Sequence, residues 1–359
     1  MKGQLDRQGG PGPAVTYILP LRRGRGGELA DLPGYLGMVS SWEGVAVLVV
    51  DGSPPEVFAE HARLLPPGIG HLRPGYSCLN GKVSGVLTGL DVARTELCVI
   101  ADDDVRYTED SFTELLRHLR TADLVRPQNY FTQLPWHARW DTARTLLNRA
   151  LGADYPDTLG VRRSILRASG GYDGDVLFEN LELIRTVRAA GGTELRVQDL
   201  FVARKPCSAR HFWTQRVRQA YDDFAQPVRL ATELLLLPVL AAGSLRRRGF
   251  PLAVAGLAVG LAEIGRRRSR GREVFAPSSA LWAPAWVLER SVAVWAALAL
   301  RFAGGVPYAG RRLRTAAHSE RFLRRRLNDR RNELSLAGAF RPAPQTVSTH
   351  TEPLRSLPQ

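Results

Sequence analysis

The chain has 359 residues, with 49 Lys and Arg against 35 Asp and Glu and a formal net charge of +14. This length allows one large or two ordinary domains with a real core, which excludes a peptide or a disulfide-stabilised miniprotein. With 44% hydrophobic and 23% charged residues, wholesale disorder is also excluded. The three cysteines, Cys78, Cys98 and Cys207, form no CxxC pair. We interpret them as reduced thiols in a cytosolic setting rather than disulfides or zinc ligands.

The positive charge is concentrated in the last third of the chain. Residues 1–225 carry 27 basic and 27 acidic side chains, whereas residues 226–359 carry 22 basic and 8 acidic side chains. A basic segment can meet nucleic acid or anionic lipid, and the sign of the charge does not choose between them. Because the arginine clusters alternate with apolar runs, we favour lipid and expect no nucleic-acid partner.

Short apolar runs alternate with helical patterns through the first part of the chain. Residues 1–13 are polar and rich in Gly and Pro, so we expect a disordered start without a secretory signal and a cytoplasmic location. Strands are predicted at 15–19, where Pro20 is expected to stop the strand, and at 45–50, 71–73 and 97–100. Helices are predicted at 29–40, 83–93 and 108–119. This alternation predicts a mostly parallel α/β sheet.

Three apolar segments follow, at residues 230–245, 249–265 and 280–300. A membrane span needs about 20 apolar residues, so their lengths are marginal. Arginine clusters flank the middle segment on both sides, and a span there would leave one cluster outside, against the positive-inside tendency. Three interpretations stay open: short spans, helices in the interface with arginines on headgroups, or buried helices of a soluble domain. Residues 336–359, rich in Pro, Ser and Thr, are predicted to be a disordered tail.

Acidic residues follow two of the predicted strands. In open α/β sheets ligands bind at the carboxyl ends of strands, where Asp51 and the run Asp102, Asp103, Asp104 are expected to lie. Two acids at positions i and i+2, Asp102 and Asp104, can share a hard divalent ion whose other ligands are diphosphate oxygens and water. A solvated acidic turn is the alternative, since a lone DxD is a weak signal.

Two further patterns have a functional and a plain structural interpretation. Lys82 stands at the start of a predicted helix, where a cation suits a phosphate, although a surface lysine is equally expected. Glu179, Glu182 and Arg185 recur at helical spacing. Such a pattern is usually a solvated stripe of ion pairs on the helix surface. It forms part of a site only if that helix faces the acidic loop, which is the run Asp102, Asp103, Asp104.

The order of these motifs resembles that of a family 2 glycosyltransferase over about residues 14–225. The nearest resemblance is to the ceramide glucosyltransferase and hopanoid-glycosyltransferase branch, which joins its catalytic domain to C-terminal membrane helices. No single motif is diagnostic, and the resemblance depends on their order. The motifs, in chain order, are Val49-Val50-Asp51-Gly52-Ser53, Asn80-Gly81-Lys82, Asp102-Asp103-Asp104-Val105-Arg106, Gly170-Gly171-Tyr172-Asp173, Glu179-Asn180-Leu181-Glu182-Leu183 and Gln215-Arg216-Val217-Arg218.

The resemblance implies a GT-A fold, which is Rossmann-like, followed by membrane or interfacial helices. It also implies a nucleotide-diphosphate sugar donor, Mg²⁺ or Mn²⁺ as cofactor, and inversion at the anomeric carbon. The expected organisation is a nucleotide-sugar half at 14–120, an acceptor half at 121–225, membrane-associated helices at 226–305, and a basic segment with a disordered tail at 306–359.

The resemblance also assigns roles to residues at the donor site. Asp51 would contact the nucleoside, and Asp102 and Asp104 would hold the metal on the diphosphate. Lys82 and Asp103 are further donor-binding candidates. Gln215 and Arg218 occupy the family's QxxRW position near the diphosphate, although Gln219 replaces the tryptophan.

The catalytic base is where the sequence departs most from the family. The family's proposed base is an acid at the position of Asn180, and an amide cannot take a proton, so the role would pass to Glu179 or Glu182. A catalytically inactive scaffold of the same fold is therefore an alternative. A sugar nucleotidyltransferase of the same broad fold is the weaker alternative.

The expected function is thus a membrane-associated inverting glycosyltransferase with a lipid or cell-envelope acceptor. Its catalytic domain is expected on the cytoplasmic side of the cell membrane, where nucleotide sugars are supplied. Trp136, Trp140 and Trp213 could line an acceptor site or pack in the core. The segment 211–213 resembles the family's amphipathic helix at the membrane surface.

Overall fold

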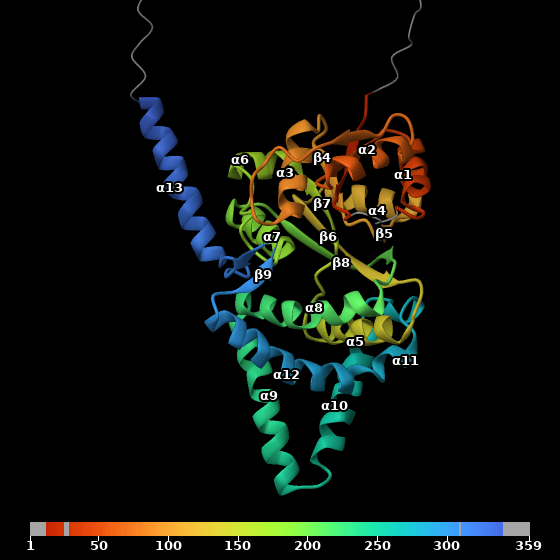
Figure 1. Ribbon diagram of the computed structural model, residues 1–359, viewed down its shortest axis with the longest axis vertical. Helices are drawn as coiled ribbons and strands as arrows, with labels where there is room; N and C mark the ends of the chain where they lie inside the picture. The colour runs from red at the N-terminus through yellow and green to blue at the C-terminus, as the bar shows by residue number, and fades with distance from the viewer. Residues whose placement is uncertain (1–11, 25–28, 309, 340–359) are drawn as a thin grey trace, which may run out of the picture.

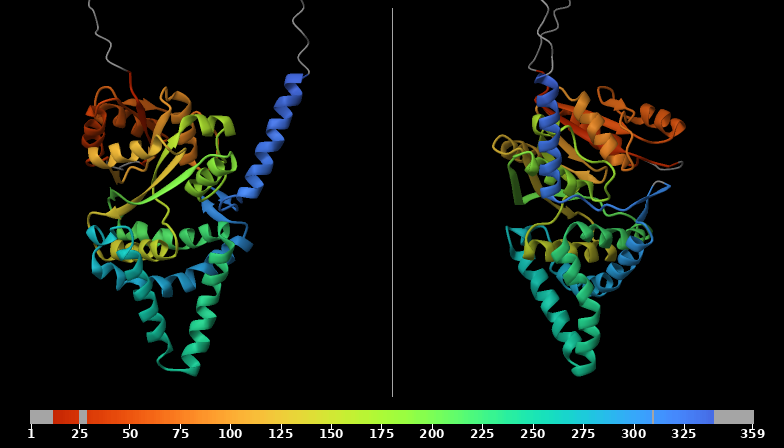
Figure 2. Two further views of the ribbon diagram at one scale, coloured as in Figure 1. Left: turned by 180° about the vertical axis from the view of Figure 1, so that it is seen from behind. Right: turned by 90° about the vertical axis from the view of Figure 1, so that its left-hand side faces the viewer.

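The computed structural model describes residues 12–24, 29–308 and 310–339. An α/β domain lies above a layer of helices, from which a two-helix hairpin projects on the far side (Figure 1). The views in Figure 2 show the same layers from behind and from one side. The sheet, which can position a site, and the projecting hairpin thus lie on opposite sides of the helical layer.

The α/β domain is built on one eight-stranded sheet. The strands are β1 (Val15–Leu21), β2 (Val45–Asp51), β3 (Gly70–Leu72), β4 (Leu97–Ala101), β5 (Val105–Arg106), β6 (Leu124–Phe131), β7 (Thr158–Arg162) and β8 (Glu194–Arg204), in the order β3-β2-β1-β4-β7-β6-β8-β5. Strands β1 to β4 pair in parallel with one another, as do β6 and β8. Strand β7 is antiparallel to its neighbours β4 and β6, and β5 is antiparallel to β8. The mostly parallel sheet confirms the predicted α/β class and is consistent with a Rossmann-like GT-A domain.

Helices cover both faces of the sheet. They are α1 (Leu32–Ser41), α2 (Pro55–Leu64), α3 (Gly81–Val92), α4 (Glu109–Leu119), α6 (Arg163–Ser169) and α7 (Glu179–Ala189). Successive side chains of a strand point to opposite faces. Accordingly Tyr17 and Leu19 of β1 join the core formed with α1 and α4, while Ile18 joins the core formed with α3, α6 and α7.

Two differences from the expected elements have local causes. Strand β1 continues through Pro20 to Leu21 instead of stopping at the proline. Its pairing with β4 ends at Ile18, so Pro20 has a neighbouring strand on one side only, which proline tolerates. Helix α2 was not predicted, because only Val57 and His61 of it are buried and its apolar pattern is correspondingly weak.

A layer of helices lies beneath the sheet, and a hairpin descends from it (Figure 1). The layer contains α5 (Trp136–Leu151), α8 (Ala209–Tyr221), the short η1 (Asp222–Ala225), η2 (Gly271–Glu273), α11 (Pro277–Ala280) and α12 (Ala283–Phe302). The hairpin is formed by α9 (Pro227–Arg246) and α10 (Phe250–Arg267), with residues 246–248 at its tip. Ala258 and Ala262 of α10 pack against Leu146 of α5 and attach the hairpin to the layer.

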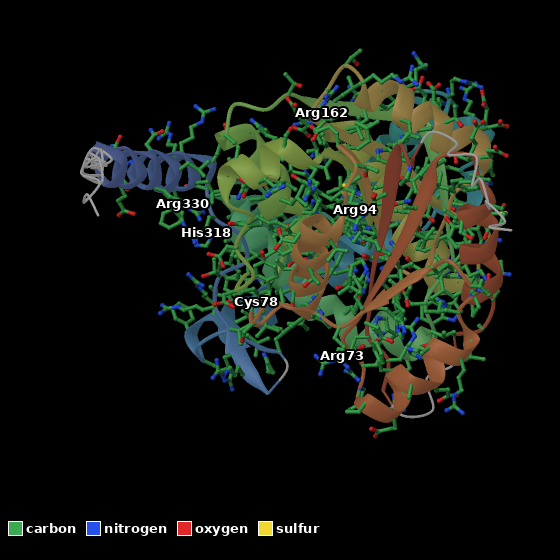
Figure 3. All side chains as sticks on the ribbon, turned by 90° about the horizontal axis from the view of Figure 1, so that it is seen from above. Arg73, Cys78, Arg94, Arg162, His318 and Arg330 are labelled. Atoms are coloured by element: carbon green, nitrogen blue, oxygen red, sulfur yellow. The ribbon has the colours of Figure 1, made fainter. Side chains whose placement is uncertain are left out.

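After α12 the chain returns to the α/β domain. The hairpin of β9 (Val306–Tyr308) and β10 (Arg311–Leu313) packs its Val306 and Leu313 into a core that includes Leu181 and Tyr221. Helix α13 (Glu320–Ala339) then runs outward, with His318 near its start and Arg330 along it (Figure 3). This helix was not predicted, and residues 336–339 of the expected tail belong to it. Residues 340–359 of that tail and 1–11 of the expected disordered start lie outside the described residues.

Candidate active site

Two adjoining cavities open around the loop that follows β4. The smaller cavity, about 340 Å³, is lined by Lys82, Asp102, Glu179, Arg218 and Tyr308, among others. The larger cavity, about 640 Å³, reaches down to the helical layer, where its lining includes Asp141, Arg144, Asn148, Arg229 and Arg290. Side chains common to both cavities include Asp103, Asp104, Asp157, Arg204, Gln215 and Asp222.

Lys82 joins the acidic loop to helix α7. Its Nζ lies 2.7 Å from Asp102 Oδ1 and 3.0 Å from Glu179 Oε1. Asn80 caps α3 by accepting a hydrogen bond from the Lys82 backbone N–H at 3.1 Å, which fixes the start of the helix. Burial tends to lower the pKa of Lys82, but attraction to Asp102 and Glu179 outweighs it, so the pKa is raised and the ammonium stays charged.

Asp104 forms an ion pair with Arg204, the last residue of β8. Arg204 Nη2 lies 2.7 Å from Asp104 Oδ2, and the same guanidinium pairs with Asp157. Neither Arg204 nor Asp157 was predicted from the sequence. Asp157 directly precedes β7, and this position beside a strand was the only signal that could have identified it.

The acidic cluster has the chemistry of a divalent-cation site. Burial, together with repulsion from Asp157 and Asp104, raises the pKa of Asp102 to about 7 despite the opposing Lys82. Asp104 Oδ1 is buried and has no hydrogen-bond partner in the described part of the chain. An unpaired carboxylate oxygen beside a second, repelling carboxylate fits a hard cation.

Protein ligands alone do not complete such a site. Within residues 12–24, 29–308 and 310–339, no group of three or more His, Cys, Asp or Glu side chains could hold a metal. A cation held by Asp102 and Asp104 would therefore take its remaining ligands from a bound molecule and water, as Mg²⁺ commonly does.

Asp51 lies away from both cavities. Its carboxylate is fully buried, accepts a hydrogen bond from the Ser53 N–H at 2.9 Å, and lies 2.6 Å from His61 Nδ1 and 3.2 Å from His71 Nε2. Burial favours a higher pKa for Asp51, but the hydrogen bonds from Ser53 and His61 outweigh it and the pKa is lowered. In this structure, local partners occupy the carboxylate that the resemblance assigns to the nucleoside.

The two candidates for the base, Glu179 and Glu182, and the neighbouring Asn180 lie in different surroundings. Glu179 faces the smaller cavity beside Lys82. Glu182 is fully buried and binds His318, accepting from its backbone N–H at 2.7 Å and lying 2.9 Å from its Nδ1. Asn180 donates from Nδ2 to the Pro156 carbonyl at 3.1 Å. The structure therefore brings only Glu179, of the two acids, to the acidic loop.

The QxxRW-like segment lies on α8 and meets the returning chain. Arg218 lies over the ring of Tyr308 with 4.9 Å between guanidinium carbon and ring centroid, and the Tyr308 hydroxyl donates to Asn80 Oδ1 at 3.4 Å. Gln215 is hydrogen-bonded to His211. Tyr308 was missed because the segment after residue 305 had no recognisable motif.

The remaining candidates have clear positions. Asp103 lines both cavities and forms an ion pair with Arg23, which lines the larger one. The tryptophans Trp136, Trp140 and Trp213 form one cluster, with ring centroids 5.7 to 6.3 Å apart, and none of them lines either cavity. Trp213 remains 51% exposed on α8.

No family model matches the chain, and no curated protein matches it. Solved structures with a similar fold include the mannosyltransferase PcManGT from Pyrobaculum calidifontis in complex with GDP-Man and Mn²⁺. It is 17% identical with a TM-score of 0.45, and the match covers 79% of this chain and 88% of that one. A second is a mycobacterial protein, 16% identical with a TM-score of 0.40, covering 58% and 73% of the two chains. Both are similarities of fold alone.

Proposed function

We propose that the chain is an inverting glycosyltransferase that uses a nucleotide-diphosphate sugar and a divalent cation. The observation that carries this proposal is the meeting of Asp102 and Asp104 with Lys82, Arg204 and Arg218 around one pocket. Carboxylates for a cation and three basic side chains are the groups that a leaving diphosphate needs, because negative charge develops on it in the transition state.

The side chains divide into two tasks. Asp102 and Asp104 hold the cation, which when bound supplies Lewis-acid stabilisation of the diphosphate oxygens. Lys82 and Arg218 line the same pocket and bind phosphate oxygens directly. Tyr308 holds the Arg218 guanidinium against the pocket wall, so that less side-chain freedom is lost when the donor binds.

Donor binding can be tested by thermal shift of the detergent-purified protein with GDP or UDP, each with Mn²⁺ or Mg²⁺. A ligand that binds only the folded state stabilises it by about 2.7 kcal/mol at a hundred times its Kd. We expect a metal-dependent shift that Asp104→Ala abolishes and Asp110→Ala, on the exposed start of α4, leaves intact. A full shift in the Asp104 variant contradicts the metal role.

Turnover separates an enzyme from a scaffold. Release of GDP or UDP from nucleotide sugars, measured with the same protein, is expected for the glycosyltransferase. If the protein binds nucleotide sugars but releases no nucleotide, the result supports a catalytically inactive scaffold. That alternative is based on Asn180, an amide at the position of the family's catalytic acid.

We also propose that the α9–α10 hairpin enters a membrane. By length and composition, two helices in the described part of the chain could cross one: α9 and the stretch Pro277–Phe302. The hairpin leaves large apolar side chains exposed, namely Val228, Leu235, Leu237, Val239, Leu245, Leu252, Leu257 and Ile264. So many large apolar side chains exposed on two adjacent helices are uncommon on a soluble monomer and are typical of a lipid-facing surface.

We propose that α12 lies along the membrane surface rather than across it. One stripe of the stretch is exposed and apolar, formed by Leu281, Leu288, Val292, Trp295 and Phe302. The opposite stripe contains Trp286 and Arg290, buried against the helical layer. A helix with one buried and one apolar exposed face is suited to the interface, with Trp213 and Trp295 at headgroup depth.

Membrane attachment can be measured by flotation with vesicles that contain anionic lipid. Full burial of a leucine side chain contributes about 1.5–3 kcal/mol, so Leu235→Ser, Leu252→Ser and Leu257→Ser together should reduce bound protein more than a hundredfold. The matched control is Leu64→Ser, an equally apolar and half-exposed side chain on α2. Unchanged flotation of the triple variant contradicts the proposal.

The position of the site supports a proposal for the acceptor. The wall of the larger cavity includes Arg229 of α9 and Arg290 of α12, so the reaction site adjoins the helices assigned to the membrane. We propose a lipid or cell-envelope glycan acceptor and a catalytic domain on the cytoplasmic side, where nucleotide sugars are supplied.

A further inference from the structure

The proposed reaction needs a proton acceptor, and neither of the two acids assigned to that role from the sequence is well suited to it. Asn180 has an amide, and Glu182 is enclosed against His318 away from both cavities. Glu179 faces the smaller cavity, but its carboxylate is occupied by Lys82 at 3.0 Å and by the Asn80 amide, which donates to it at 3.3 Å.

A fourth acid, Asp222, stands where the two cavities meet. It begins η1 directly after α8 and lines both cavities. Its Oδ1 is buried and has no hydrogen-bond partner among the described residues. The adjacent acid differs completely, because Asp223 lies 2.9 Å from Arg229 Nε and 3.1 Å from Arg290 Nη1. The fold therefore pairs Asp223 with two arginines and leaves the Oδ1 atom of Asp222 without a hydrogen-bond partner among the described residues.

We propose that Asp222 is the catalytic base of the sugar transfer. This inference rests on the proposed function, with the donor in the smaller cavity and the acceptor in the larger one. The acceptor hydroxyl loses its proton to the Asp222 carboxylate as its oxygen forms a bond to the anomeric carbon. The bond from that carbon to the diphosphate oxygen breaks, and its electron pair leaves with the nucleoside diphosphate.

The surroundings of Asp222 favour uptake of a proton. Burial is the largest cause of its raised pKa; Asp223 and Glu179 raise it further, and Arg218 and Arg290 oppose them. Asp222 also follows the last turn of α8, where the partial negative charge of the helix disfavours a carboxylate. A base becomes stronger as its pKa rises, up to the working pH.

Glu179 has the opposite balance. Burial raises its pKa, but the Lys82 ammonium and hydrogen bonds outweigh burial, and the pKa is lowered. A carboxylate held in its charged form by a lysine accepts a proton poorly. Its position suits it to holding Lys82 toward the donor, which is a binding role.

The first arm of the test does not depend on activity. Infrared difference spectra of wild type and Asp222→Asn, recorded as the pH is raised, should show a protonated-carboxyl band that only the wild type has. The band should disappear at a pH above the ordinary range of aspartate. If the two proteins give the same spectra, Asp222 lacks the inferred environment and the proposal is wrong.

The second arm measures turnover with GDP-mannose and UDP-glucose as donors and octyl glucoside as the acceptor probe. We expect Asp222→Asn to lower kcat about 10²–10⁴-fold while the donor KM and the nucleotide-induced thermal shift stay near wild type. Asp222→Glu, which keeps a carboxylate, should restore part of the rate. Glu179→Gln should instead raise the donor KM, because it loosens Lys82, and Asp110→Asn should behave as wild type.

The outcomes separate the two proposals. If the wild type neither binds nucleotide nor releases it from a sugar donor, the proposed function fails and the base assignment fails with it. If the wild type turns over and Asp222→Asn retains its kcat, only the base assignment is wrong. Loss of the acid limb of the kcat pH profile in Asp222→Asn supports the assignment.

Discussion

Glu182 and His318 show how one buried carboxylate can join two distant parts of the chain. Glu182 lies on α7, inside the α/β domain, and His318 lies just before α13. The hydrogen bond to Glu182 is the largest cause of the raised pKa of His318, and burial opposes it. The imidazole also stacks on Phe322, with 4.5 Å between ring centroids.

This contact should make stability depend on pH. Because the folded-state pKa of His318 is raised, its contribution is complete below the unfolded pKa of about 6.5 and is lost as pH rises through the folded pKa. We expect the free energy of unfolding to fall across that window in the wild type and to fall less in His318→Phe. Urea unfolding on either side of the window measures this, and equal pH slopes in the two proteins would contradict it.

The sequence located several residues of the site but not their partners. Asp102 and Lys82 could be brought together because strand ends and helix starts meet at one edge of a parallel sheet. Asp157 and Arg204 could not, because Asp157 directly precedes β7 and Arg204 ends β8, and the places of these strands in the sheet depend on pairings far apart in sequence. Asp222 could not be identified from the sequence either, because the lack of a hydrogen-bond partner for its Oδ1 depends on how the folded chain packs.

Among the elements, α10 is attached to the body through a close contact between backbones. A Cβ on Gly265 would lie 1.8 Å from the Leu146 carbonyl oxygen of α5. Arg149 secures the same junction, since its fully buried guanidinium donates to the carbonyls of Gly265 at 3.1 Å and Arg268 at 2.5 Å. The base of the hairpin is therefore rigidly joined to the helical layer.

Two glycines of α10 should respond oppositely to the same substitution. Gly265→Ala forces α10 away from α5 and should cost about 1–3 kcal/mol of stability. Gly260→Ala, on the same helix, meets nothing within 4 Å and should be neutral or stabilising by up to about 1 kcal/mol. Thermal unfolding of the two detergent-purified variants measures the difference, and equal melting temperatures would show that the contact is unimportant.

At the scale of elements, prediction succeeded where strands are short and wholly apolar. The run at 45–50 and the acid that follows it correspond closely to β2 (Val45–Asp51). Helix α13 was not predicted because its sequence is mostly arginine and other polar residues. In the part of the helix whose burial is described, Leu323 is the one large apolar side chain that is buried. A helix held by so few apolar contacts has no amphipathic period to recognise.

Across the whole molecule, buried ion pairs connect the helical layer to helix α9 of the hairpin. Arg290 of α12 is 1% exposed and lies 3.1 Å from Asp223, which also binds Arg229 of α9. Three elements thus meet at one carboxylate. Charges this deeply buried are tolerated only when each has its partner.

Removal of one partner should therefore be costly for the entire chain. We expect Arg290→Ala to reduce stability by up to about 3–5 kcal/mol, because it removes one of the two arginines that pair with the buried Asp223. Arg272→Ala, at an exposed arginine of η2, removes the same charge from the surface and should change stability by less than about 0.5 kcal/mol. Denaturant unfolding of both variants provides the comparison.

The position of Tyr308 in the chain has a consequence for biosynthesis. This residue closes the smaller cavity against Arg218, yet it follows the entire α9–α10 hairpin and α12 in sequence. A ribosome adding about 5–20 residues per second needs roughly 5 to 21 s to pass from Arg204, at the end of β8, to Tyr308. A nascent chain therefore contains its complete apolar hairpin before the smaller cavity has all of its lining side chains.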